Sequence, residues 1–244
     1  MKKSKYNVLA IADTQAPFEH QDYLKFLVAV GVKYGILRRP GKLEKNGLVI
    51  HAGDEQDQHT LGSFDPDPDG MSGGEELTAA QRSLMPYFEA FPDVKVCISN
   101  HTDRIFRKAF RHGIPRGYLK DYREFLKAPK GWEWQDKWTV DGVRYIHGEG
   151  YSGQLGALNA AKDAMKPTVI GHLHSDAGIQ FWANEDQLLW GMNVGCGIDK
   201  SKYAFHYGKK LRRKPILSCG VILKGQPLLI PMWLDRRGRW TGKV

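Results

Sequence analysis

The sequence predicts an α/β fold with α+β features, in which two β-sheets are flanked by helices. The first half alternates short apolar runs with helical periodicity, which is typical of βαβ units and a largely parallel sheet. The second half carries paired apolar runs joined by turn residues, which is typical of antiparallel hairpins. The length of 244 residues suits one domain spanning residues 1–244.

In the first half, three short apolar runs read as buried strands, over residues 8–12, 48–50 and the start of 94–101. Each run is followed by polar residues. Apolar residues at helical spacing predict a helix over residues 23–37 and another over 75–91. Pro86 should kink or divide the second helix, because proline cannot donate a backbone hydrogen bond.

In the second half, Asp141-Gly142 lies between alternating runs and predicts a hairpin within residues 137–148. Residues 177–195 predict a second hairpin turning at 184–186, and residues 216–234 a third turning at 224–227. Between the first two, residues 154–165 are alanine-rich and predict a helix, which is followed by an apolar run over 168–170.

Composition places the chain among globular proteins without a membrane span. Apolar residues make up 41% and charged residues 26%, and no apolar run reaches the ~18 residues of a membrane helix. The apolar part of the N-terminus is short and runs into Asp13, so we expect no signal peptide. Three cysteines without CxxC spacing argue against a disulfide framework, and we expect a cytoplasmic location.

A formal net charge of +9 favours polyanionic partners. The densest basic run is residues 209–214, and residues 236–243 form another. A third group consists of Arg104, Arg107, Lys108 and Arg111. Basic clusters of this kind fit nucleic acid as a partner, although such runs are also common on solvated faces.

Polar residues that can bind a metal follow five of the predicted strands. They are Asp13, Gln15, Asp54, Asn100, His147, His172 and His174. Because ligands collect outside the carboxyl ends of strands, these segments can meet in one pocket. Seven such residues suffice for two cations that share a carboxylate. Mixed oxygen and nitrogen ligands without thiolate suit manganese, iron or zinc.

The same segments resemble the motifs of the calcineurin-like metallophosphoesterases. That family shows, in order, DxH, GDxxD, GNHD or GNHE, a lone histidine, and GHxH. This chain has ADTQ, GDEQD, SNHTD, IHGE and GHLH, ending at Gln15, Asp57, Asp103, Glu149 and His174. The resemblance implies a two-sheet β-sandwich flanked by helices, with the site at its upper edge.

The resemblance also implies roles for the residues. Two divalent metal ions would be held, one by Asp13, Gln15, Asp54 and His174, the other by Asp54, Asn100, His147 and His172. His101 would act on the leaving oxygen as a catalytic residue, oriented by Asp57. Arg104 and Asn100 would contact the substrate phosphate. Residues 193–199 resemble a family segment that shapes the pocket.

The chain departs from the family pattern at three positions. Gln15 stands where most relatives have histidine, and its harder oxygen ligand favours manganese, with magnesium, iron or zinc as alternatives. Ser99 replaces the usual glycine, and Thr102 stands where an acid often follows the histidine. Asp57 can supply the orienting carboxylate in place of that acid.

Three functions remain open at this point. Net charge and the arginines after His101 favour a phosphodiesterase or nuclease acting on nucleic acid. A phosphomonoesterase, acting on a nucleotide, a small molecule or a phosphoprotein, is the alternative with the same metals. A non-catalytic scaffold is the third, and the intact ligands argue against it. Residues 65–76 match calcium-loop spacing, but their prolines and glycines indicate an acidic loop near Asp54 instead.

Overall fold

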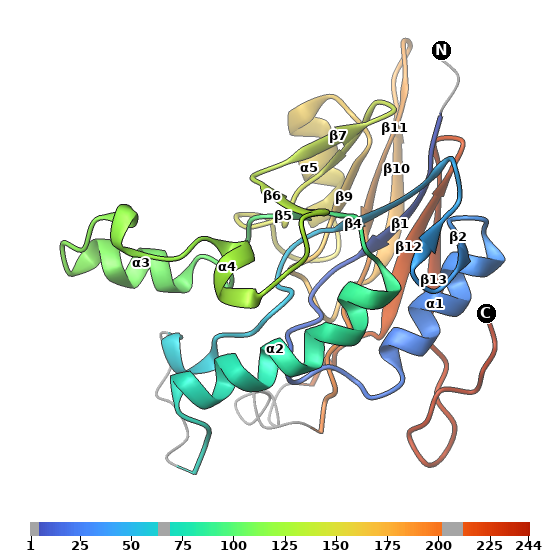
Figure 1. Cartoon of the computed structure of the whole chain (residues 1–244). Helices are drawn as coiled ribbons and strands as arrows, with labels where there is room; N and C mark the ends of the chain where they lie inside the picture. The colour runs from blue at the N-terminus through green and yellow to red at the C-terminus, as the bar shows by residue number, and fades with distance from the viewer. Residues whose placement is uncertain (1–4, 63–68, 202–211) are drawn as a thin grey trace.

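The computed structural model describes residues 5–62, 69–201 and 212–244, and contains two main β-sheets (Figure 1). The larger sheet has six strands, in the spatial order β13 (Gln226–Pro231), β12 (Ser218–Leu223), β1 (Asn7–Ile11), β4 (Gly47–His51), β5 (Val94–Cys97) and β6 (Trp132–Gln135). The second has five, in the order β10 (Gly178–Ala183), β11 (Leu188–Asn193), β9 (Thr168–Ile170), β8 (Val143–Tyr145) and β7 (Trp138–Val140).

Strand direction explains where polar residues gather. Strands β1, β4, β5 and β6 run parallel, so their carboxyl ends share one edge of the larger sheet. Strands β8, β9 and β11 run parallel in the second sheet. The remaining neighbours pair antiparallel, which includes the three predicted hairpins.

The two sheets pack face to face around one apolar core. Side chains alternate between the faces of a strand, and in β1 Val8 and Ala10 point to the second sheet. They meet Tyr145, Val169 and Met192 from the five-stranded sheet. This packing confirms the predicted two-sheet sandwich.

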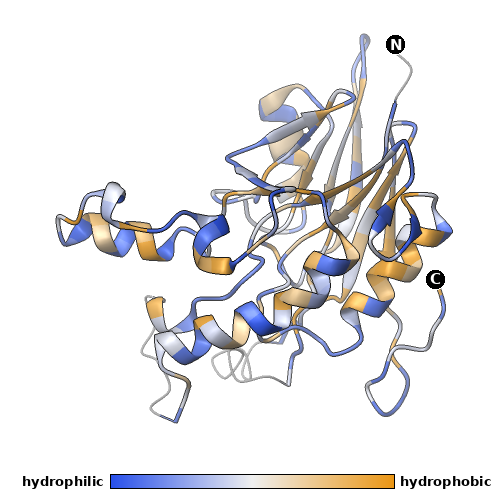
Figure 2. Ribbon diagram, in the orientation of Figure 1, coloured by the Kyte–Doolittle hydropathy of each residue, from blue (hydrophilic) through white to orange (hydrophobic). Residues whose placement is uncertain are grey.

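Helices cover the outer faces, as expected. Helices α1 (Tyr23–Lys33) and α2 (Gly73–Ala90) pack on the opposite face of the larger sheet, against a core that includes Leu9 and Ile11. Helix α5 (Gly156–Ala164) packs on the outer face of the second sheet. In Figure 2 apolar colours are prominent on α1, whereas α2 alternates between apolar and hydrophilic colours along its length.

The segment between β5 and β6 leaves the body of the molecule. Helix α3 (Arg104–Arg111) lies at the far left in Figure 1, followed by the short helices η2 (Arg116–Tyr118) and α4 (Tyr122–Leu126). The sequence analysis assigned no helix here. Asp121 and Glu124 form a capping box at the start of α4, as Ser72 and Glu75 do for α2.

Several boundaries differ from expectation. The helix predicted over residues 23–37 ends at Lys33, because Gly35 takes a left-handed conformation (φ +64°) and Leu37 begins the hairpin of β2 (Leu37–Arg39) and β3 (Lys42–Leu43). Pro86 does not divide α2, which continues to Ala90. The third hairpin turns at residues 224–225 alone, both with positive φ.

Part of the acidic segment 65–76 lies outside the described residues, including Asp65 and Asp67. Its last member, Glu76, accepts hydrogen bonds from the backbone nitrogens of His59 and Thr60 and thereby ties α2 to the short helix η1 (His59–Leu61). Within the described ranges, no helix is both long and apolar enough to cross a bilayer.

Candidate metal centre

The carboxyl ends of five strands bring the predicted ligands to one place. Asp13 follows β1, Asp54 follows β4 and Asn100 follows β5, all at the same edge of the larger sheet. His147 follows β8 and the pair His172 and His174 follows β9, at the matching edge of the second sheet. The seven side chains therefore meet where the two edges adjoin.

One group of atoms surrounds the Asp13 carboxylate. One nitrogen of His174, Nε2, lies 2.9 Å from Oδ1 of Asp13 and 3.2 Å from the amide nitrogen of Gln15. The same amide nitrogen lies 3.5 Å from Oδ2 of Asp54. Ligand atoms of Asp13, Asp54 and His174 all lie within 4.8 Å of one another, which is the spacing of a metal site.

A second group surrounds Nε2 of His147. This atom lies 2.7 Å from Oδ1 of Asn100, 3.1 Å from Nδ1 of His172 and 3.3 Å from Oδ2 of Asp54. The other ring nitrogen, Nδ1, lies 2.9 Å from the carbonyl oxygen of Ala52. A hydrogen bond from Nδ1 to that carbonyl leaves the lone pair of Nε2 facing the group, which is the tautomer that binds a metal.

Four of the seven side chains stand on strained backbone. Asp13 (φ 50°), Gln15 (φ 49°), Asp54 (φ 57°) and His172 (φ 68°) are all left-handed, although none is glycine. Such conformations cost about 1–3 kcal/mol each and concentrate at functional sites. Here they turn the chain back after each strand, so that the side chains point into the group.

Two glycines allow close approach of the loops. A Cβ on Gly171 would lie 2.4 Å from Oδ2 of Asp13, so only glycine fits beside that carboxylate. Gly53 has φ +97°, and a Cβ there would lie 2.8 Å from Nδ1 of His147. The backbone N–H of His172 donates to Oδ2 of Asp13 at 2.8 Å, which fixes the same carboxylate from the loop side.

Buried charge dominates the electrostatics of the group. Burial would raise the pKa of Asp54, but His101 and His147 outweigh it and hold that pKa well below its usual range. Burial would lower the pKa of His147, yet the Asp54 carboxylate raises it to about 9. The pKa of His174 is raised as well, since Asp13 outweighs burial, whereas burial and His147 lower that of His172.

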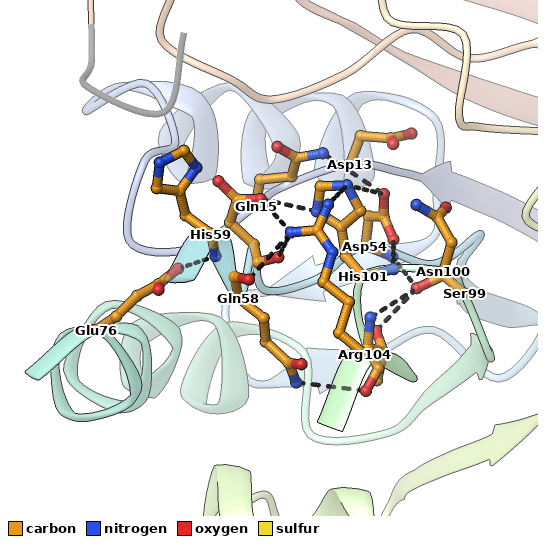
Figure 3. Close-up of polar contacts among 12 residues, drawn as sticks. Asp13, Gln15, Asp54, Gln58, His59, Glu76, Ser99, Asn100, His101 and Arg104 are labelled. Carbon is orange, nitrogen blue, oxygen red and sulfur yellow. Dashed lines mark hydrogen bonds and ion pairs between the residues drawn. The ribbon is translucent and has the colours of Figure 1, made fainter. Parts of the chain in front are cut away.

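His101 lies beside the group and faces Asp57. Its Nδ1 lies 2.7 Å from Oδ1 of Asp57, an ion-pair contact without hydrogen-bond alignment. Its Nε2 lies 2.7 Å from a nitrogen of Arg104 and 3.8 Å from Oδ2 of Asp54. Arg104 also donates to the carbonyl oxygens of Asp57 and Gln58, so its guanidinium braces the imidazole (Figure 3).

Two of the three residues that depart from the motifs, Ser99 and Thr102, belong to a buried hydrogen-bond network. The hydroxyl of Ser99 accepts from the backbone of Asp54 at 2.8 Å and lies 2.8 Å from that of Thr102. Thr102 in turn donates to Glu55, which also accepts from the indole of Trp134. Burial raises the pKa of Glu55 to about 7. This network holds the loop of His101 against the loop of Asp54.

His51 and the segment 193–199 support the group from behind. His51 fits none of the five motif positions, so the motifs alone do not identify it. Its ring is buried between the hydroxyl of Thr14 at 2.9 Å and the backbone of Gly53, and burial lowers its pKa to about 4. The signal was its place at the end of β4, three residues before Asp54.

Residues 193–199 shape the site without entering it, as expected. The amide of Asn193 donates to the carbonyl oxygens of Leu173 and Asp176, both at 2.8 Å, and so holds the loop of the histidine pair. The backbone N–H of Gly197 donates to the carbonyl of Asp13. Cys196 is fully buried, which raises the pKa of its thiol.

A cavity of about 390 Å³ opens beside the group. Asn100 and His172 lie at one end, and the remaining lining includes the four basic residues of α3. They are Arg104, Arg107, Lys108 and Arg111. Glu149 is the acidic residue that lines this cavity. Positive charge therefore surrounds the space next to the predicted ligands.

The described residues of the other two basic clusters do not line this cavity. Residues 209–211 of the run 209–214 lie outside the described residues, and Arg213 is paired with Asp176 at 2.8 Å. In the C-terminal run, Arg239 binds the buried carboxylate of Asp22 through two hydrogen bonds of 2.6 Å. Only the α3 cluster faces the candidate metal centre among the described residues.

Comparison with known proteins gives likenesses among solved structures. No family model and no curated protein matches the sequence. Among solved structures, the chain is similar to a metallophosphoesterase from Sphaerobacter thermophilus, with 13% identity and a TM-score of 0.45 over 93% of this chain and 88% of that chain. A likeness at this identity and TM-score says nothing about the chemistry of the site, which has to follow from the site's own side chains.

Proposed function

We propose that the chain is a metal-dependent phosphoester hydrolase that cleaves phosphodiester bonds in nucleic acid. The carrying observation is the convergence of seven polar side chains from five strand ends, together with their strained backbone. The alternative is a phosphomonoesterase with the same centre, and the test below separates the two.

The donor atoms fit a pair of divalent cations. Nε2 of His147 carries at most one hydrogen, yet it faces Asn100, Asp54 and His172 at 3.3 Å or less. One hydrogen can satisfy only one of these three contacts, whereas a cation satisfies several at once. The Asp13 group adds a second buried carboxylate, 0% exposed, whose contacts include Nε2 of His174 and the backbone N–H of His172.

Asp13, Gln15, Asp54 and His174 would hold one cation, and Asp54, Asn100, His147 and His172 the other. Gln15 presents its amide nitrogen to His174, so its oxygen must turn inward to serve as a ligand. The oxygen-rich donor set without thiolate favours manganese, with magnesium, iron or zinc as alternatives. When bound, such a pair supplies an activated water and neutralises the phosphate.

The chain's own residues handle the leaving oxygen. His101 lies next to Asp54, so its Nε2 can reach a phosphoester held at the centre, and its contact with Asp57 on the Nδ1 side leaves Nε2 to act on the leaving oxygen. Arg104 faces this Nε2 and fixes the orientation of the ring. In the presence of a phosphate, the same arginine is placed to bind its oxygens.

Nucleic acid is favoured by the charge around the centre. The four basic residues of α3 line the cavity beside Asn100 and His172, and the whole chain carries a net charge of +9. Rows of Arg and Lys bind phosphate backbones and give strongly salt-dependent affinity. A phosphomonoester needs only one phosphate site and leaves most of this basic row without a role.

The test uses full-length protein stripped with a chelator and reloaded with manganese. We expect hydrolysis of bis(p-nitrophenyl) phosphate, a diester, and of single-stranded DNA or RNA, with little hydrolysis of p-nitrophenyl phosphate or mononucleotides. Hydrolysis of the monoester alone would establish the alternative. No hydrolysis of any of these compounds with manganese, magnesium, iron or zinc would contradict the proposal.

A further inference from the structure

We infer that helix α3 carries the binding path for a single nucleic acid strand, with phosphates along its basic face and an unpaired base against Phe110. This inference names the substrate class of the proposed hydrolase and rests on that proposal for the position of the scissile phosphate. The binding itself can be measured without turnover.

The basic face follows from helical spacing. Arg104, Arg107, Lys108 and Arg111 are spaced i, i+3, i+4 and i+7, so they form one stripe along α3. At 1.5 Å per residue the stripe extends about 10 Å away from the candidate metal centre. Its N-terminal end, Arg104, lies at His101, so a strand whose phosphate reaches the centre would place the next phosphates along the stripe.

The outer part of the stripe is available for phosphates. Within the described ranges, no carboxylate lies within ion-pair distance of Arg107, Lys108 or Arg111. Arg107 donates to the carbonyl of Asn100, which holds it beside the centre. Arg104 by contrast is occupied by Asp57, Gln58 and His101. Lys108 and Arg111 are therefore the residues to test.

An apolar hollow of about 470 Å³ adjoins the basic cavity. Arg107 and Arg111 line both, so the two spaces lie on either side of the same arginines. The hollow is lined by Phe106, Phe110 and Ile114 among others. The side chain of Phe110 is 84% exposed and that of Ile114 45%, so the two form an exposed apolar patch in which the Phe110 ring is open to a planar partner.

This pairing of surfaces distinguishes a single strand from other phosphoesters. Proteins that bind single strands combine a basic track for the backbone with aromatic side chains on which bases stack. In a duplex the bases are paired and stacked on one another, so Phe110 could not reach a base face. A phosphopeptide has phosphate but no regular planar group beside it.

The experiment measures binding of fluorescein-labelled oligothymidylate by anisotropy, with a chelator present so that no hydrolysis occurs. We expect Phe110→Ala to weaken binding about tenfold or more, and Phe110→Trp to restore it, because stacking requires an aromatic ring. Lys108→Ala with Arg111→Ala should reduce the slope of log affinity against log salt by about 1.4, since each lost phosphate contact contributes about 0.7.

Matched controls lie on the same chain. Tyr118 is 82% exposed on η2 but lines neither the basic cavity nor the apolar hollow, so Tyr118→Ala should leave affinity unchanged. Lys45→Ala with Lys130→Ala removes the same charge at the opposite sheet edge, before β4 and β6, and should leave the salt slope nearly unchanged. Thermal unfolding of each variant checks that it remains folded.

Equal weakening by Phe110→Ala and Tyr118→Ala, or duplex binding as tight as that of the single strand, would overturn the inference. So would an equal loss of salt dependence in the Lys108/Arg111 and Lys45/Lys130 double variants. Single-strand binding through Phe110 in a protein that hydrolyses no phosphoester would retain the binding path and reject the proposed hydrolase. Phosphoester hydrolysis in a protein whose single-strand binding is unchanged by Phe110→Ala would retain the proposed hydrolase and reject the binding path.

Discussion

Nε2 of His147 lies 2.7 Å from the side-chain oxygen of Asn100, while Nδ1 of the same ring lies 2.9 Å from the carbonyl oxygen of Ala52. Both nitrogens thus face oxygen acceptors. A neutral imidazole has one N–H and can serve only one of them. The ring therefore holds an extra proton when no cation is bound, in agreement with its pKa of about 9.

Cation binding should release this proton. The raised pKa means that His147 is protonated below about pH 9, and a metal ligand must be neutral, so the proton competes with the cation. We expect manganese affinity to fall as pH drops from about 9 to 6, with at least one proton released per chain at pH 7, because His174, whose pKa is also raised, adds to the release from His147. Titration calorimetry in buffers of different ionisation enthalpy measures the release.

His147→Gln provides the control for proton release. The glutamine amide keeps a polar group near Asn100 but has no titratable nitrogen. Manganese binding by this variant should therefore release about one proton fewer than manganese binding by the original protein. Manganese binding by the original protein that releases no proton at pH 7 would show that His147 is neutral before the cation arrives.

Asp54 and His101 should fail in different ways. Asp54 contacts both groups of ligand atoms, and Asp54→Asn should lose manganese and turnover together. His101→Ala should keep the metal but lose about 10²–10⁴-fold in kcat, the usual contribution of a general acid. Metal analysis by mass spectrometry beside diester hydrolysis separates the two. An empty centre in His101→Ala would assign that residue to metal binding instead.

Gly171 should be intolerant of even one methyl group. The added Cβ would overlap Oδ2 of Asp13, so Gly171→Ala should weaken manganese binding and cost about 1–3 kcal/mol of stability through overpacking. Gly74 is the matched control, because a Cβ there meets nothing within 4 Å in the first turn of α2. Gly74→Ala should stabilise by about 0.5–1 kcal/mol without changing metal content. Equal behaviour of the two variants in thermal unfolding and metal analysis would contradict the close approach.

The ion pair of Asp22 with Arg239 should stabilise the fold only above acid pH. The hydrogen bonds from Arg239 outweigh burial and lower the pKa of Asp22 to about 2, below its ordinary value of 3.8. Because the pKa of Asp22 is lower in the folded state than in the unfolded state, the ionised carboxylate stabilises the fold at every pH above about 4. This stabilisation is lost as pH falls from about 4 to 2. The midpoint of thermal unfolding should therefore differ between the original protein and Asp22→Asn at pH 6 and converge near pH 2. A difference that persists at pH 2 would rule out this pair as its source.

The sequence predicted the elements that carry strong local signals. Asp141-Gly142 placed a hairpin because both residues tolerate positive φ, and short apolar runs placed β1, β4, β5 and β9. The polar residues after those strands identified the candidate centre, because parallel strands bring their carboxyl ends to one edge. Their distances required the tertiary structure.

Other features depended on tertiary context. Helix α3 was missed because its periodicity lies in its basic residues, whose spacing of i, i+3, i+4 and i+7 was a usable signal. Trp134 and Trp138 are close in sequence but belong to different sheets, since the chain crosses between sheets after β6. The network of Glu55 with Thr102 joins loops 47 residues apart and leaves no local pattern.

The most direct test of the metal centre is an anomalous difference map from crystals of the protein soaked in manganese. We predict two peaks, one among Asp13, Gln15, Asp54 and His174 and one among Asp54, Asn100, His147 and His172, and loss of both in Asp54→Asn. A map without density among these seven side chains, at a manganese concentration that supports turnover, would contradict the account.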